Sequence, residues 1–131
     1  MNAKTIIASI SLAALPALGT DLEGGTFAGL TTTKDGTHCA VVLLSGKAED
    51  LTWEAAKAWA AEQGGELPTR PVAALLFANV QPALSPEWHW TADEYYASYA
   101  WDCNFNDGGQ IISHKGYELS AVAVRLIPIT A

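Results

Sequence analysis

The most constraining feature of the sequence is an uninterrupted apolar run at residues 39–44, within the segment HCAVVLLSG. Consecutive side chains of a strand point to opposite faces of a sheet, and here both alternating sets are apolar. Such a strand is stable where other parts of the chain cover both of its faces. The run therefore predicts a central strand that is covered on both sides.

The segment after this run, LTWEAAKAWAAEQGG, has the pattern of a helix. Thr52 can act as its N-cap, Glu54 suits the positive first turn, and the glycine pair 64–65 can form a left-handed C-terminal cap. The apolar side chains form a broad inward face: Trp53, Ala55, Ala56, Trp59 and Ala60.

A second helix is predicted from LPTRPVAALLFANVQP. Thr69 is placed as its N-cap, Pro71 falls in the first turn, where no amide donor is needed, and Pro82 ends the run. The inward positions recur at helical spacing: Val72, Leu75, Leu76 and Val80.

Strand signals lie on both sides of the helices. TFAGLTT precedes the apolar run across the turn KDGT, and beyond the helices the period changes to two. In that part Trp101, Cys103 and Phe105 are predicted to face one side and Asp102 and Asn104 the other, before a hairpin turn at NDGG and a returning strand at QIIS. The chain closes with an apolar strand at 121–127, which Pro128 is expected to end.

This order, strands followed by two helices and then a strand-rich aromatic half, predicts an α+β domain at residues 21–131. Residues 1–20 form an apolar N-terminal arm with one lysine, Lys4, and small residues at Ala17 and Gly19. The arm imitates a secretory signal peptide and is too short to span a bilayer. We expect a retained arm that packs on the domain or on a neighbouring subunit; a cleaved signal is the alternative.

Charge and cysteine usage exclude several classes of protein. The net charge is −7, from 14 acidic and 7 basic residues without a basic run, so nucleic acid and anionic membranes are poor partners. The two cysteines, Cys39 and Cys103, lack zinc-ligand spacing. They form either a disulfide or two buried thiols, and their apolar surroundings favour thiols.

Several motifs occur in the order found in a known family. They are Trp53, Leu67-Pro68-Thr69, Trp90-Thr91-Ala92-Asp93-Glu94, Tyr99-Ala100-Trp101, Phe105, Asp107-Gly108-Gly109, Lys115 and Val124-Arg125. About eighty residues of the chain resemble the Lcl C-terminal domain family, a variant of the C-type-lectin-like fold. The resemblance implies two helices packed on an antiparallel sheet with an aromatic-rich C-terminal hairpin. Calcium-mediated sugar binding is not implied, because the Glu-Pro-Asn and Gln-Pro-Asp triplets are absent.

The compact form, with GGTFAGL near the start and ALLFANV in the second helix, is most similar to versions of the family encoded by phages and prophages. The resemblance implies a virion or tail-fibre module for host-surface recognition, and hence a location in the phage particle. Its partners would be other virion or fibre proteins and a host glycan or protein, and homo-oligomerisation stays open. The alternatives are a structural virion component that docks through the N-terminal arm and a secreted or cell-surface carbohydrate-binding protein of bacteria.

In the first helix and the aromatic half together, we expect Trp53, Trp59, Trp90, Trp101 and Phe105 to build the core. The candidate ligand-binding residues are those in loops or on the polar face of the hairpin, where tyrosines offer contact area and amides offer adaptable hydrogen bonds: Trp88, Asp93, Tyr95, Tyr96, Tyr99, Asp102, Asn104, Asn106 and Gln110.

Catalytic and cofactor sites are not expected. Asp93 and Glu94 are adjacent and lack a second carboxylate at a defined separation, and a calcium site would need 6–8 oxygens. The isolated histidines, His38, His89 and His114, show no ligand spacing. We therefore expect a protein without enzymatic activity, cofactor or metal. Arg125 lies in the apolar closing strand and is expected to pair with a carboxylate, at Asp93, Glu94 or Asp102.

Overall fold

The computed structural model describes residues 7–130 as an α+β structure, in which two helices pack on a mostly antiparallel sheet. The elements follow in the order β1 (Ile10–Ser11), η1 (Leu12–Ala14), β2 (Asp21–Leu22), β3 (Gly25–Thr32), β4 (His38–Leu51), α1 (Trp53–Glu62), α2 (Arg70–Val80), η2 (Gln81–Ala83), β5 (Trp88–Tyr96), β6 (Tyr99–Asn104), β7 (Gln110–His114) and β8 (Leu119–Thr130). The strands are ordered β2-β3-β4-β8-β5-β6-β7, and β1 pairs with β8. The predicted α+β class is confirmed.

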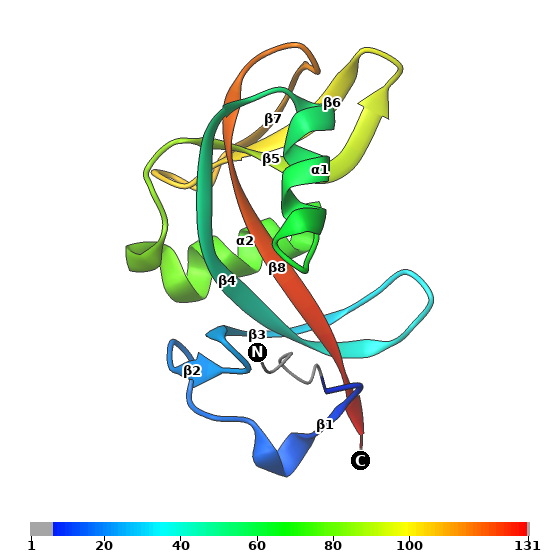
Figure 1. Ribbon diagram of the computed structural model, residues 1–131, viewed down its shortest axis with the longest axis vertical. Coiled ribbons are helices and arrows are strands. Elements are labelled where there is room, and N and C mark those ends of the chain that lie inside the picture. Colours follow the sequence, from blue (N-terminus) through cyan, green and yellow to red (C-terminus); the bar gives the residue numbers. More distant parts are fainter. Residues whose placement is uncertain (1–6, 131) are drawn as a thin grey trace.

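The long strands β4 and β8 form an antiparallel spine, with β1–β3 at one end and β5–β7 at the other (Figure 1). Leu43 lies opposite Val124, and Cys39 lies opposite Pro128. The prediction that Pro128 ends the closing strand is therefore wrong, since β8 continues to Thr130. Proline keeps an extended backbone and removes a single ladder donor, so pairing can continue near the end of a strand.

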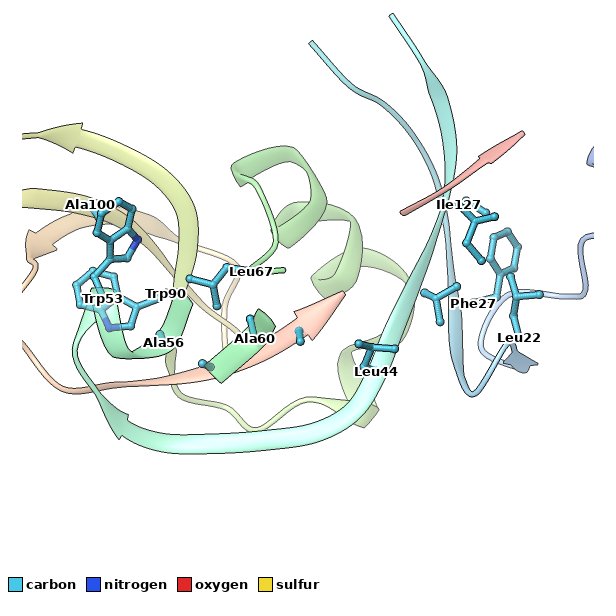
Figure 2. Packing of buried hydrophobic residues seen from close by; sticks show 14 residues of the cluster. Leu22, Phe27, Leu44, Trp53, Ala56, Ala60, Leu67, Trp90, Ala100 and Ile127 are labelled. Carbon is cyan, nitrogen blue, oxygen red and sulfur yellow. The ribbon is translucent and has the colours of Figure 1, made fainter. Parts of the chain in front are cut away.

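The spine separates two apolar clusters, as the doubly apolar run predicted. Ala40 and Val42 of β4 face the cluster that contains Trp53 of α1, whereas Val41 faces the cluster that contains Leu76 of α2. The two helices therefore cover opposite faces of the spine. Figure 2 shows the first cluster, which includes Leu22, Phe27, Leu44, Trp53, Ala56, Ala60, Leu67, Trp90, Ala100 and Ile127.

Both helices begin where their capping residues predicted. The Thr52 hydroxyl accepts a hydrogen bond from the Ala55 amide, and the Thr69 hydroxyl accepts one from the Val72 amide, each at 3.4 Å. Gly64 follows α1 with a φ of 81°, a conformation that glycine adopts without a Cβ penalty. These local signals mark where both helices begin and where α1 ends.

The part of the N-terminal arm that the structure describes lies along the domain. Ile10 pairs in parallel with Ile129 of β8, and Ile7 and Leu15 pack against the first cluster. Residues 1–6 of the arm lie outside the described residues. In the range 7–130, no helix is both long enough and apolar enough to cross a membrane.

The two cysteines are buried free thiols, as their apolar surroundings predicted. Burial raises the pKa of both the Cys39 and the Cys103 thiol, because the thiolate loses its hydration. Neither thiol is therefore poised for reaction in the folded chain.

Candidate functional site

The candidate site lies on the face of the β5–β6–β7 ladder that points to the side of α2. Tyr99 and Trp101 are two residues apart along β6, so their side chains point to this same face. Tyr99 lies opposite His114 of β7. The Tyr99 and His114 ring centroids are 5.7 Å apart, and the Tyr95 ring meets the Trp101 ring edge-on at 5.8 Å. We call Tyr95, Tyr96, Tyr99, Trp101, Gln110 and His114 the contact face, which includes Tyr96 because it pairs with Tyr99.

Arg70, the first residue of α2, joins this face through contacts on three sides. Its guanidinium carbon lies 3.5 Å from the centroid of the Trp101 ring. Its Nε donates to Gln110 Oε1 at 2.9 Å, and Gln110 Nε2 donates to the Arg70 carbonyl at 3.0 Å. Its backbone amide donates to Asp93 Oδ2 at 2.7 Å. Stacking and hydrogen bonds therefore hold the guanidinium in one orientation.

A cleft of about 1040 Å³ opens beside this arginine, between the end of β3, the start of α2 and β5. Its apolar lining consists of Pro71, Val72, Ala74, Ala92, Trp101 and Leu126. Its polar lining consists of Thr31, Thr32, Thr33, Lys34, Thr69, Arg70, Asp93, Glu94 and Gln110. A space of this size is at the upper limit of the range of ligand-binding clefts.

The acidic side chains of the cleft are already engaged within the chain. Asp93 accepts a hydrogen bond from the Arg70 amide. This bond also places the negative charge of Asp93 at the positive end of α2. Glu94 pairs with Lys115, and the hydrogen bond from that ammonium lowers the pKa of Glu94. By contrast, neither Arg70 nor Lys34 has an ion-pair partner among residues 7–130.

The structure brings together four of the residues predicted to bind a ligand. Asp93 and Gln110 line the cleft, and Tyr95 and Tyr99 lie on the contact face. Tyr96, 71% exposed, pairs with Tyr99 beside the hairpin turn. The proximity of these side chains follows from the register of the ladder.

Three other predicted residues lie at the opposite end of β5 and β6. Trp88 is half-buried and pairs with Asn104, whose Oδ1 accepts a hydrogen bond from the Asn106 amide at 2.8 Å. At about 3.3 Å per residue, Trp88 lies about 25 Å along the strand from Tyr96. These residues therefore belong to a separate surface.

Asp102 was predicted to face outward, and this prediction is wrong. Its side chain is 1% exposed, and among residues 7–130 its Oδ1 has no hydrogen-bond partner. Asp102 shares its face of β6 with Ala100 and pairs with Trp90, both in the first cluster, so the alternation of polar and apolar residues did not mark a solvent face. Burial raises the pKa of Asp102 to about 6, against the effect of a hydrogen bond from Ser113.

Two further expectations require correction. Trp101 is half-buried instead of lying in the core, because the α2 side of β6 opens into the cleft at this residue. Arg125 pairs with no carboxylate of residues 7–130: its Nε donates to the Gly64 carbonyl at 3.5 Å and its Nη1 to the Glu23 carbonyl at 3.3 Å. Backbone carbonyls within reach take the place of the expected acid.

Sequence reasoning missed the role of Arg70. A cation in the first turn of a helix faces the positive end of the macrodipole, which is unfavourable, so its presence there indicates a compensating contact elsewhere. The stack on Trp101 is that contact. The partner could not be identified from sequence, because 31 positions separate the two residues.

Among residues 7–130, no three His, Cys, Asp or Glu side chains are grouped in a way that could hold a metal ion. His89 is 2% exposed and packs against the Phe105 ring at 4.6 Å, and burial lowers its pKa. Among the aromatic residues predicted for the core, Trp53, Trp90 and Phe105 are buried and Trp59 is half-buried.

No protein-family model matches the chain, and no curated protein matches it.

Proposed function

We propose that the chain is a non-enzymatic recognition module with a C-type-lectin-like fold, carried by a phage particle as a virion or tail-fibre component. Its contact face would bind the surface of the host cell. The observation that carries this proposal is the set of exposed tyrosines on a hydrogen-bonded ladder, beside the cleft of Arg70.

The exposure of these tyrosines is large for aromatic side chains. Tyr95 is 56% exposed, Tyr96 is 71% exposed and Tyr99 is 40% exposed. Tyrosine offers a wide contact area and a hydroxyl while losing few rotamers on binding. Because the strands hold their backbones in register, a partner would meet a surface that is already ordered.

Support for the lectin-like fold comes from the two helices on a mostly antiparallel sheet and from the aromatic hairpin, which is what the family resemblance implies. The phage setting rests on that resemblance. Support for binding over catalysis comes from the acidic groups of the cleft: Asp93 and Glu94 are engaged with Arg70 and Lys115, which lowers their availability as an acid–base pair.

The test is adsorption to host cells of particles that carry a variant of this chain. Replacing Tyr96 and Tyr99 together by Ala should reduce adsorption about tenfold or more, as loss of aromatic interface anchors does. The matched control is Ile111→Ala, since Ile111 is 48% exposed and lies on β7 opposite Asp102. Unchanged adsorption of the tyrosine variant would contradict the proposal.

A further inference from the structure

We propose that the cleft beside Arg70 binds the carboxylate of an acidic side chain in an extended peptide segment of a partner protein. This inference rests on the proposed function, because it names the chemistry recognised at one end of the contact face. It is carried by the geometry of a single guanidinium group and by the groups that surround it in the cleft.

The Arg70 guanidinium is held in one orientation, and only some of its N–H groups donate hydrogen bonds within residues 7–130. Its Nε donates to Gln110, while its terminal nitrogens, Nη1 and Nη2, have no hydrogen-bond partner among residues 7–130. Together these nitrogens carry four N–H donors in a planar fork. A carboxylate matches that fork with two parallel hydrogen bonds, and the stack on Trp101 has already restricted the side chain.

The other walls of the cleft favour a peptide over a sugar. Three of its four threonine hydroxyls are engaged within the chain: Thr32 with His38, Thr33 with Asp35 and Thr69 with the Val72 amide. Because these hydroxyls already have partners within the chain, fewer of them are free to pair with the hydroxyl groups of a sugar. An acidic residue with aliphatic neighbours would satisfy the guanidinium and also cover Pro71, Ala74 and Leu126, which line the cleft and are exposed or half-buried.

Charge limits the number of acidic residues that such a segment can carry. The chain has a net charge of −7, and Asp93 and Glu94 lie in the cleft lining. A run of acids would therefore meet like charges, whereas one carboxylate can pair with Arg70, with Lys34 as a second cation at the rim. The expected ligand is an isolated Glu or Asp between apolar residues.

The probes are two acetylated and amidated pentapeptide libraries that differ only at the central position, Glu in one and Gln in the other, with aliphatic residues at the flanks. Binding to the full chain is followed by the NMR signal of the Trp101 indole N–H, assigned with the Trp101→Phe variant. The Glu library should shift this signal and bind about tenfold more tightly than the Gln library, since charge-assisted bidentate bonds are lost in the latter.

The variants distinguish the effect of the Arg70 guanidinium on binding from the effect of the net charge. Arg70→Gln should weaken binding of the Glu library about tenfold, and Arg70→Lys should restore only part of it, because an ammonium lacks the planar fork. Arg125→Gln is the matched control: it changes the net charge equally at the other arginine and should bind as the unaltered chain does. Thermal unfolding of each variant shows whether it is folded.

Equal binding of the two libraries, or equal binding by Arg70→Gln and Arg125→Gln, would overturn the inference. So would an oligomer of glucuronic acid that shifts the Trp101 signal in an Arg70-dependent way while the Glu library does not. Adsorption to host cells distinguishes failure of this inference from failure of the proposed function. If Arg70→Gln adsorbs normally while the Tyr96 and Tyr99 double variant does not, the inference is wrong and the recognition function stands.

Discussion

The buried carboxyl of Asp102 predicts an unusual dependence of stability on pH. Its pKa lies at about 6 in the folded chain against an ordinary value of 3.8, chiefly because burial disfavours the ionised form. The folded state therefore holds the proton more tightly than the unfolded chain does. Consequently, the contribution of Asp102 to the free energy of unfolding falls as the pH rises from about 4 to about 6, and it is constant above that window.

The size of this contribution follows from the difference between the two pKa values. About two pKa units at about 1.4 kcal/mol each give about 3 kcal/mol. At neutral pH, therefore, an ionised Asp102 with an unpaired Oδ1 is a net cost to the fold. Asp102→Asn keeps the shape of the side chain but cannot ionise. In this variant, residue 102 should therefore make no pH-dependent contribution to the free energy of unfolding.

The assay is urea unfolding of the wild-type chain and Asp102→Asn at several pH values between 4 and 8. Other carboxyls, such as Glu94, whose pKa is lowered by Lys115, change stability in the opposite direction, but they are present in both proteins and cancel in the difference. The variant should gain about 2 kcal/mol relative to the wild type between pH 4 and pH 7, because part of the full effect has already occurred at pH 4. Parallel pH profiles for the two proteins would refute the reasoning.

Three further predictions concern the core, a helix cap and the thiols. Trp90→Ala should cost about 3–5 kcal/mol in chemical unfolding, because the indole is fully buried and donates to the Leu51 carbonyl at 2.8 Å; a loss below about 1 kcal/mol would contradict this packing. Thr69→Ala should cost about 1 kcal/mol by the same measurement, and no change would show that the hydroxyl does not cap α2. Cys39 and Cys103 should react with a thiol reagent only after unfolding, and rapid labelling of the native chain would argue against their burial.

Much of the fold could be predicted because its signals are local. Thr52 and Thr69 mark the first turns of both helices with side chains that bond to nearby amides. The apolar run in β4 required cover on both faces, and the two clusters provide it. Alternation and capping depend on neighbours in the sequence, so they are visible without the fold.

The details that could not be predicted depend on distant partners. Asp102 has a polar side chain, but it is buried because its face of β6, which it shares with Ala100, packs against the first cluster. Arg70 and Trp101 meet because the fold brings α2 against β6. Arg125 bonds to the carbonyls of Glu23 and Gly64, which lie far from it in sequence. A hydrophobic pattern shows which face of a strand is apolar, but not what will cover the other face.

The central claim is that a preformed aromatic face on the β5–β6–β7 ladder recognises the host surface. The most direct measurement is hydrogen–deuterium exchange of the full chain with and without host-cell envelopes, resolved along the sequence. Slower exchange on binding is predicted for residues 93–101 and 110–114, with no change in residues 25–30 of β3. Protection confined to other segments, or none at all with envelopes that the particle adsorbs to, would contradict the account.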